Sequence, residues 1–591
     1  MPGALLQLVG VGAQNELVNG NPSMTNFRNT YKRHTNFAME HIRVDFGSAN
    51  LNFDFNQARK LSARIDRYAQ LLNDTYLVIT LPDIWSPLIP VSTPPTGYDP
   101  HCSAIGYEFE WIRNIGYNLI DNIEITMNGQ LIQRLSGEWM KLYSYLTFTG
   151  TKRSTINKMT GNVPELYDPS HAYDRQGQYP HAVSDATPAL DISGNTIFPG
   201  TVIPEPSIRS RQLVVPLHFW FCESVGSVLP LVSMQNTEVY INVTLRPLKY
   251  LYTVVDVTPT SPTYGQRVRP DLFPMNLFLT PSMPNGAPTN PGVTTFFPSP
   301  YLECNFFYLT EMEMNQFATA DQSYMFKEVS YVGAEGQYGP NTDLVLPMRN
   351  LVSRVTWTVS RSDSIANNLW DNYTNWDDPY VAPFTSTGTA NDVFSSITQS
   401  RETQTFMYSS GQQQITSVYP RDPIVNGQIL LDGKERFSVK PTSYFSLLQM
   451  YKHTTGDSPV LPGVYMYSFA LNNDLYQPSG AINGSMFNKV ILRLGLQQPL
   501  PTTQGVESQS TVCVLKSSVF SPNPVVVTAA QLALRNPDGT LLYPPDSIVS
   551  VVRNTNGDSI IFAYTYNLGV YVESINFLRI VSGLANFVFA N

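Results

Sequence analysis

The strongest constraint on the fold is a hairpin signal that the chain uses twice. Asn128-Gly129 and Asp432-Gly433 are each flanked by apolar, alternating residues. Asn-Gly and Asp-Gly favour the type I′ turn, because both central residues of that turn need a positive φ. The two signals lie about half a chain length apart, which indicates one fold present twice.

Further matched segments follow each hairpin in the same order. They are an aromatic residue, an apolar strand, a proline-containing turn, a second strand and a closing strand that begins with Asn-Phe. The first set comprises Trp139, 214–221, Leu229-Pro230, 239–243 and 305–309, and the second comprises Tyr444, 464–469, Gln477-Pro478, 490–494 and 576–580. The spacing varies while the order holds, so we expect loops of different lengths between corresponding strands.

Composition supports a multidomain β protein. A chain of 591 residues is longer than one hydrophobic core supports. Charged residues make up 14%, against about 25% in ordinary domains, while Pro (45), Tyr (33) and Phe (30) are abundant. Such a composition is typical of many strands joined by polar loops. A weakly charged surface also suits close packing of many copies, although composition alone does not separate this from an ordinary all-β protein.

We predict eight strands in each half. In the first half they are 37–46, 60–67, 75–81, 119–127, 130–135, 212–222, 238–245 and 301–309; in the second they are 324–332, 342–347, 353–360, 423–431, 435–439, 464–471, 487–496 and 574–588. Eight antiparallel strands, with a hairpin between the fourth and fifth, fit a jelly roll. The predicted fold is all-β, with two consecutive eight-stranded antiparallel jelly rolls. The predicted domains are an N-terminal arm over 1–36, a first roll over 37–311, a connector with helical character over 312–322 and a second roll over 323–591.

The jelly-roll strand order also predicts where the long segments lie. With strands named B to I, the DE, FG and HI loops share one end of a roll, and the EF hairpin lies at the other. The long segments fall only at DE, FG or HI, and they are 82–118, 147–211, 246–300, 361–422, 440–463 and 497–573. One end of each roll is therefore expected to be plain and the other elaborated, and loops of such length usually carry a function or are disordered.

The motifs of common enzymes are absent from the sequence. The seven histidines form no HxH or HExxH, and the chain has no GxxxxGK[ST] or GxSxG. The acidic loop with Asp371, Asp377 and Asp378 does not have EF-hand spacing, so we interpret it as solvated. A net charge of −9 has the wrong sign for a protein that coats nucleic acid. We therefore predict no enzyme, no metal, no cofactor and no direct nucleic-acid partner.

The cysteines form no redox or metal motif. No two of them are close enough for CxxC, and they are Cys102, Cys222, Cys304 and Cys513. This spacing is typical of small buried residues in a reducing compartment rather than of a disulfide framework or zinc site.

No targeting or membrane-spanning segment is predicted. The N-terminus lacks a basic start and a cleavage pattern, so a secretory signal is not expected. The most apolar stretch, 213–232, contains His218 and Glu223 with prolines towards both ends, and a pair of buried strands explains it better than a bilayer helix.

The N-terminal arm combines apolar residues with a small basic cluster. Gly10 and Gly12 interrupt its apolar start, and the basic residues follow at Arg28, Lys32, Arg33 and His34. The cluster is either a solvated turn of helix or a contact point for an acidic neighbour or a lipid head group.

Several stretches resemble the major capsid proteins of nucleocytoplasmic large DNA viruses. The similar stretches are 6–15, 20–22, 31–40, 229–231, 432–437, 443–445, 463–471, 477–480, 578–583 and 590–591. They extend from one end of the chain to the other, whereas the long loops do not match. The resemblance implies a structural double jelly-roll capsid protein.

The resemblance also implies an assembly. Three chains would form a pseudo-hexagonal capsomer, and capsomers would tile an icosahedral virion shell over an internal membrane. Implied partners are the trimer mates, neighbouring capsomers, minor capsid and penton proteins, and the membrane near the arm, with assembly in the host cytoplasm. The arm would lie at the inner base, so Arg28, Lys32, Arg33 and His34 become candidate inner-face contacts, and the long loops would form outward towers.

Two other classes of protein stay open at the level of sequence. A carbohydrate-binding, lectin-like β-sandwich could share the Tyr-rich loops and the strand count, but it would need neither two rolls nor a matched arm. A cupin-like enzyme would need the missing HxH. Glycosylation has four candidate sequons, at Asn73, Asn242, Asn372 and Asn483. Only Asn372 falls in a predicted outward loop, so it is the predicted glycan acceptor.

Overall fold

The computed structural model contains all 591 residues. It describes the chain except for residues 1, 49–50, 87, 91–103, 176–178, 181–188, 191–195, 198–204, 257–266, 269–274, 280–294, 338–340, 363, 365–367, 376–421, 457–460, 498–508, 516–525, 528–533, 536–541, 544–547, 555–559, 563–564 and 590–591.

The first half of the chain forms two four-stranded antiparallel sheets, here called roll 1. In spatial order, one sheet contains β1 (Phe37–Asp45), β16 (Tyr301–Leu309), β4 (Leu71–Leu81) and β11 (Arg211–Pro216). The other contains β3 (Arg59–Ile65), β12 (Val239–Leu245), β7 (Ile120–Met127) and β8 (Gln130–Ser136). In strand letters these orders are B-I-D-G and C-H-E-F, which is the predicted jelly roll.

The second half repeats the same order and is here called roll 2. Its B-I-D-G sheet contains β17 (Gln322–Gln337), β30 (Tyr566–Val581), β19 (Leu351–Arg361) and β23 (Val464–Ser468). Its C-H-E-F sheet contains β18 (Thr342–Leu346), β25 (Val490–Leu496), β20 (Ile424–Leu431) and a broken strand F made of β21 (Lys434–Glu435) and β22 (Lys440–Pro441). The predicted double jelly roll is therefore confirmed.

The two predicted EF hairpins have matching type I′ geometry. The φ angles are 50° and 81° at Asn128 and Gly129, and 48° and 80° at Asp432 and Gly433. In each hairpin the first turn side chain accepts a 2.8 Å hydrogen bond from a backbone N–H next to strand H, which belongs to Glu238 in roll 1 and to a lysine in roll 2. The EF and GH connections thus share one end of each roll.

A helix follows strand F in both rolls. In roll 1 it is α4 (Gly137–Thr147), which begins as predicted at Ser136, whose hydroxyl accepts a 3.0 Å hydrogen bond from Trp139 N. In roll 2 the equivalent segment is a π-helical turn, η8 (Tyr444–Leu448), continued by α11 (Gln449–His453). The aromatic residue noted after each hairpin therefore marks the start of this helix.

Four predicted strands need correction. The strand predicted over 212–222 ends at Pro216, because proline has no N–H for the ladder, and α7 (Trp220–Glu223) follows it. The strand predicted over 574–588 is instead β30, which begins at Tyr566, and a separate strand β31 (Leu584–Phe587). The two are joined by a turn with φ angles of 52° and 82° at Ser582 and Gly583. The strands predicted over 435–439 and 464–471 are also shorter than expected.

Loop segments contribute small sheets at the elaborated end. In roll 1, β13 (Tyr252–Asp256) of the HI segment pairs with β6 (Ala104–Trp111) of the DE segment, as expected for loops that share an end. In roll 2, β26 (Gln509–Leu515) pairs with β28 (Ile548–Asn554). The other strands and α-helices within the two rolls are β2 (Phe53–Asp54), β5 (Leu88–Pro90), α3 (Ile115–Asn118), α5 (Gly150–Thr160), α6 (Pro164–Tyr167), β9 (Ala189–Leu190), β10 (Thr196–Ile197), β14 (Arg267–Val268), β15 (Thr295–Phe296), β24 (Ile482–Asn483), β27 (Val526–Val527) and β29 (Ile560–Phe562). Short 3₁₀ helices are η2 (Ala172–Asp174), η3 (Val225–Ser227), η4 (Leu231–Ser233), η5 (Leu248–Tyr250), η6 (Met275–Phe278) and η9 (Gly484–Met486).

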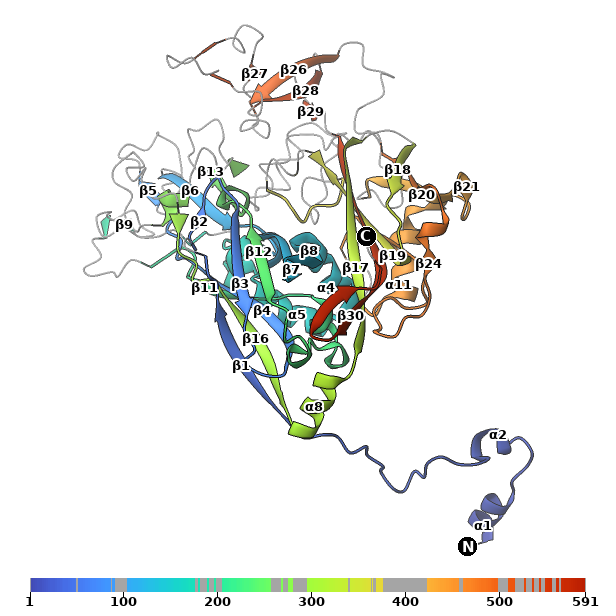
Figure 1. Cartoon of the computed structure of the whole chain (residues 1–591). Coiled ribbons are helices and arrows are strands. Elements are labelled where there is room, and N and C mark those ends of the chain that lie inside the picture. Colours follow the sequence, from blue (N-terminus) through green and yellow to red (C-terminus); the bar gives the residue numbers. More distant parts are fainter. Residues whose placement is uncertain are drawn as a thin grey trace.

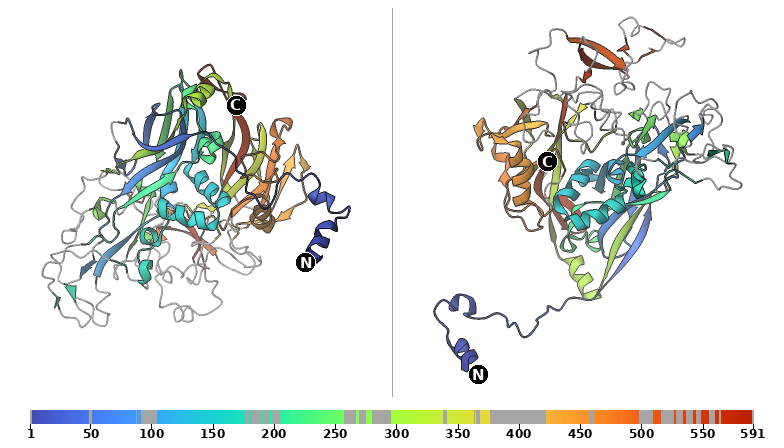
Figure 2. Two further views of the ribbon diagram at one scale, coloured as in Figure 1. Left: turned by 90° about the horizontal axis from the view of Figure 1, so that it is seen from below. Right: turned by 180° about the vertical axis from the view of Figure 1, so that it is seen from behind.

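The two rolls stand side by side, with α4 and α5 between them (Figure 1). The predicted connector contains a helix, α8 (Glu311–Thr319), at the plain end. The N-terminal arm leaves the body beside α8 and carries α1 (Pro2–Val9) and α2 (Glu16–Asn19) away from it, at the end opposite to β26 and β28 (Figures 1 and 2). None of the helices in the described residues is long and apolar enough to cross a bilayer.

Candidate functional site

The B-I-D-G sheet of roll 2 is buried on both faces over β19, β23 and most of β30, whereas much of β17 is partly exposed. Trp357, Val570 and Val572 belong to the hydrophobic core of roll 2. Tyr571, which neighbours two of them on β30, belongs instead to the cluster that fills roll 1. Because successive side chains of a strand point to opposite faces, roll 1 covers the outer face of this sheet.

Three elements of roll 1 make this cover. The ring of Trp139 on α4 lies 5.2 Å from that of Tyr571, and the ring of Trp220 on α7 lies 5.6 Å from that of Phe326 on β17. On strand F, Gln133 Nε2 donates a 2.9 Å hydrogen bond to the backbone oxygen of Lys327. The F strand of roll 1 and the helices after strands F and G therefore pack on strands B and I of roll 2.

A buried charge cluster lies in the same seam. Arg354 Nε donates to the carboxylate of Glu573, and Arg354 Nη1 lies 3.1 Å from Asp474 Oδ1. The three side chains are at most 2% exposed. Asp474 also accepts a 2.6 Å hydrogen bond from Thr455 N, and the Thr455 hydroxyl donates at 2.8 Å to a backbone oxygen at the end of α4. Two buried carboxylates thus compensate one guanidinium, which buried charges require.

The acidic loop contributes a second buried ion pair rather than a solvated segment. Lys141 Nζ on α4 lies 2.5 Å from Asp371 Oδ1, and Asp371 also accepts hydrogen bonds from the side-chain amides of Asn114 and Asn118. The prediction of a solvated loop is therefore wrong for Asp371. Asp377 and Asp378 lie outside the described residues. Among the residues that are described, no group of three His, Cys, Asp or Glu side chains could hold a metal ion.

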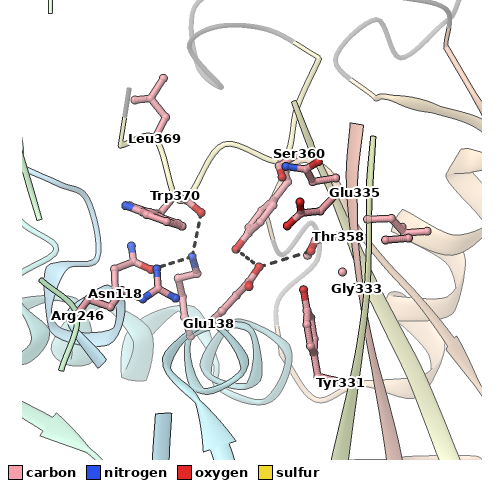
Figure 3. Close-up of a pocket in the computed structure, with 16 residues that line it drawn as sticks. Asn118, Glu138, Arg246, Tyr331, Gly333, Glu335, Thr358, Ser360, Leu369 and Trp370 are labelled. Atoms are coloured by element: carbon pink, nitrogen blue, oxygen red, sulfur yellow. Dashed lines mark hydrogen bonds between the residues drawn. The ribbon is translucent and has the colours of Figure 1, made fainter. Parts of the chain in front are cut away.

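A cavity of about 530 Å³ lies between α4 of roll 1 and strands β17 and β30 of roll 2 (Figure 3). Glu138 lies at its wall and accepts 2.8 Å hydrogen bonds from the hydroxyls of Tyr373 and Tyr571. Burial, together with the charge of Glu138, raises the pKa of both tyrosines well above its ordinary value, so both remain donors. The lining contains no histidine or cysteine, and the Glu138 carboxylate is held by tyrosines of roll 2, so this arrangement joins the rolls.

The histidine and cysteines singled out in the sequence are part of the packing of roll 1. His218 lies among aromatic rings, with its Nε2 3.1 Å from the Tyr117 hydroxyl, and burial lowers its pKa to about 3. Cys304 is buried, and burial raises its pKa to about 12. Cys222 is partly covered and also free, with a pKa raised by burial. Cys102 lies outside the described residues, and the side chain of Cys513 is not among those described.

The predicted inner-face residues lie together on the arm. Arg28, Lys32, Arg33 and His34 are all exposed and lie outside any helix, so they do not form the solvated helical turn considered above. Within the described part of the chain, no salt bridge involves these side chains. The leucines and valines of α1 and α2 are exposed as well, and the arm projects from the body (Figure 1). The arm thus presents both apolar and basic groups without cover from its own chain.

The structure places the predicted glycan acceptor inside the protein. Asn372 is 1% exposed, and its Oδ1 accepts hydrogen bonds from Thr374 N and Thr374 Oγ1 at 3.1 and 2.7 Å. A glycan needs an accessible side-chain nitrogen, so this burial speaks against Asn372, and the sequon forms a structural turn. Of the other sequons, Asn73 is buried, Asn242 is partly covered and Asn483 is exposed.

The fold and the seam define a double jelly-roll protein. Comparison with known families matches residues 25–285 to "Major capsid protein N-terminus" and residues 313–527 to "Large eukaryotic DNA virus major capsid protein". The chain therefore belongs to the major capsid protein family of large eukaryotic DNA viruses. As a member, it is a structural component of a virus capsid and not an enzyme.

Individual relatives agree with this assignment. The major capsid protein of Phaeocystis pouchetii virus is 27% identical over 86% of this chain and 95% of its own length, and that of Paramecium bursaria Chlorella virus 1 is 23% identical over the full length of both. The quasi-atomic model of the PBCV-1 virus capsid matches 96% of this chain and 100% of its own with a TM-score of 0.55 at 18% identity. The Faustovirus major capsid protein matches 98% of this chain and 96% of its own with a TM-score of 0.54 at 11% identity. These two likenesses support the fold.

Proposed function

We propose that three copies of this chain form a pseudo-hexagonal capsomer, and that capsomers tile an icosahedral shell over an internal membrane. The observation that carries the proposal is the repetition of one strand order in two rolls that stand side by side. Three chains with two similar rolls each supply six similar wedges, and closed cyclic symmetry covers the flanks that a single chain leaves open. The wedges correspond to the predicted domains, 37–311 and 323–591, joined by the connector at 312–322.

The arm is assigned to the inner face of the shell. Residues 2–36 carry exposed apolar side chains together with Arg28, Lys32, Arg33 and His34. An anionic lipid surface, a neighbouring capsomer or a minor capsid or penton protein could cover both kinds of group. Deletion of residues 2–36 should leave trimers intact and impair shell formation, because roll 1 begins only at β1.

The loop end is assigned to the outside of the shell. It lies opposite the arm, and it carries the added strands β26 and β28 (Figure 1). A shell needs regular contacts at its inner and lateral faces and tolerates elaboration outside. Buried free thiols suit assembly in a reducing host cytoplasm.

Native mass spectrometry of the purified protein tests whether three chains form a trimer. Electron microscopy of assembled material tests whether the trimers pack as hexagonal units of a shell. A trimer at micromolar concentration and roughly hexagonal particles are expected. A chain that stays monomeric under all assembly conditions would contradict the proposal. Brief protease treatment of intact particles tests the orientation, with cuts expected in the long loop segments, and cuts near Asn128 or Asp432 would reverse it.

A further inference from the structure

We propose that the cavity between the rolls binds an aliphatic diamine or polyamine, and that the bound cation bridges Glu138 of roll 1 and Glu335 of roll 2. The proposal goes beyond the capsid function and does not depend on the trimer, because the cavity of about 530 Å³ lies within one chain. Its volume is in the usual range for small-molecule sites. The class of ligand follows from the charges, the aromatic surface and the shape of the roll 2 wall.

Two carboxylates face the cavity, and no described residue forms a salt bridge with either of them. Glu138 accepts its hydrogen bonds from neutral tyrosine hydroxyls. Figure 3 shows Glu138 reaching into the cavity from α4 and Glu335 reaching into it from β17. Two like charges around one partly enclosed space favour a ligand of the opposite charge, because their fields add inside it.

The two cations in the cavity wall already have other partners. Lys141 Nζ lies 2.5 Å from Asp371 Oδ1, and Arg246 Nε lies 3.7 Å from Asp121 Oδ1. Both aspartates lie outside the lining of the cavity. The Arg246 guanidinium also lies over the Trp370 ring, 4.5 Å from its centroid. Each cation is therefore compensated from outside, and the described lining keeps the negative charge of its two carboxylates.

A pair of glycines shapes the roll 2 wall. Gly333 on β17 pairs with Gly569 on β30 in the register of the sheet. Glycine inside a strand packs no side chain, and it often marks a place where another group comes close. Here that group is the Tyr331 side chain: a Cβ at Gly333 would lie 2.9 Å from its hydroxyl oxygen, and a Cβ at Gly569 would lie 3.3 Å from its ring. The glycine pair thus lets the Tyr331 ring lie against the sheet.

Tyr331 provides an aromatic surface beside both carboxylates. Its ring lies 5.1 Å from that of Tyr571, yet Tyr331 remains 59% exposed. Burial raises the pKa of Tyr331, and the charges of Glu138 and Glu335 raise this pKa further, in keeping with their positions around its ring. An ammonium group near the face of a tyrosine gains cation–π attraction. The methylene groups of an aliphatic amine would pack on the same ring, which an inorganic cation cannot do.

Isothermal titration calorimetry of the full chain at low salt tests the site with 1,4-diaminobutane, 1-aminobutane and 1,4-butanediol. The diamine should bind about tenfold more tightly than the monoamine, because only the diamine can meet both carboxylates, and the diol should not bind. Glu138→Gln keeps an acceptor for the tyrosines and should weaken diamine binding about tenfold. Glu335→Gln should weaken it about threefold, because this carboxylate is exposed. The matched control is Glu311→Gln, which removes an exposed carboxylate of α8 outside the cavity and should leave binding unchanged.

Thermal unfolding gives an independent readout. The diamine should raise the unfolding temperature of the unaltered protein as its concentration increases, and it should not do so for the double variant Glu138→Gln/Glu335→Gln. Unfolding without ligand checks that each variant is folded, and the exposed position of Glu335 keeps the test decisive if Glu138→Gln is not.

Three results would overturn the proposal. The first is the absence of both binding heat and thermal shift with the diamine. The second is equal binding of the diol, which would indicate a site for neutral polyols. The third is a loss of diamine binding in Glu311→Gln as large as in Glu335→Gln, which would indicate attraction to the net charge of the protein. None of these results bears on the proposed trimer, which native mass spectrometry tests separately.

Discussion

The two B-I-D-G sheets have the same strand order but different surroundings within one chain. In roll 2, the first strand, β17, buries Tyr324 and Phe326 in the cluster shared with roll 1. In roll 1, nearly every residue of β1 has an exposed side chain. The same topology therefore carries one first strand whose side chains are partly covered by the other roll and one whose side chains are left exposed. An assembly protein needs this asymmetry, because a surface satisfied within the chain cannot drive association.

The largest expected effect comes from Trp139. Trp139→Ala removes a buried ring from the seam and leaves a cavity, so we expect a loss of about 3–5 kcal/mol in the free energy of unfolding. Tyr451→Ala on the exposed equivalent helix should change the monomer by no more than about 0.5 kcal/mol. Urea titration of the monomer measures both. Tyr451 on α11 is 79% exposed, so a large loss for Tyr451→Ala would contradict this contrast between the two helices.

The buried charge cluster gives the next largest effect. Glu573→Gln leaves Arg354 with only Asp474 as a charged partner, and breaking a buried pair should cost about 3 kcal/mol, the lower end of the usual range. On the roll 1 sheet, Arg43 and Asp45 form a 2.7 Å pair whose side chains are 58% and 67% exposed. Asp45→Asn should therefore have no measurable effect on unfolding.

The dependence of unfolding on salt concentration compares the buried ion pair with the exposed one. The effect of Glu573→Gln should persist at high ionic strength, because solvent ions do not reach the seam. Equal costs for Glu573→Gln and Asp45→Asn would contradict the contrast between the two sheets.

Acid should destabilise roll 1 through His218. Its folded pKa is about 3 and its ordinary value is 6.5, so the unfolded chain binds more protons between these values. The stability that the neutral ring contributes is thus complete above pH 6.5 and is lost as the pH falls towards 3. Because the His218 side chain is partly exposed, the loss in unfolding free energy should be smaller than the full pKa difference implies. We expect a loss of about 2 kcal/mol between pH 7 and pH 4. His218→Phe should flatten this part of the curve of unfolding free energy against pH, and an unchanged slope would contradict the assignment.

Local features of the fold could be predicted from the sequence because local residues determine them. Asn128-Gly129 specifies a turn by its own φ preferences. Ser136, three residues before Trp139, caps the N-terminus of α4. Alternating or continuous apolar runs marked most of the strands. The predicted end of strand 212–222 is wrong because the apolar run continues unchanged past Pro216, where β11 ends, into α7.

The seam could not be predicted, because its partners are far apart in sequence. Lys141 and Asp371 are separated by 230 positions, and nothing in the residues around either one identifies the other. Polar residues in a long loop are usually exposed, so the sequence around Asp371 and Asn372 predicts exposed side chains. One signal was present: Lys141 lies on a helix whose other residues are mostly apolar, and a lone lysine there needs a buried partner.

Among the substitutions expected to destabilise the protein, the pair with the smallest effect should cost the same in both rolls. Gly129 and Gly433 have φ angles of 81° and 80°, and a Cβ at either position would meet no atom within 4 Å. Alanine therefore adds backbone strain alone, so Gly129→Ala and Gly433→Ala should each cost about 1 kcal/mol. Thermal scans of the two variants measure the difference. Equal costs would show that the plain ends of the rolls are equivalent although their sheets are not. A cost several times larger at one turn would mean that a neighbouring segment depends on that hairpin, and the two rolls would then differ at both ends.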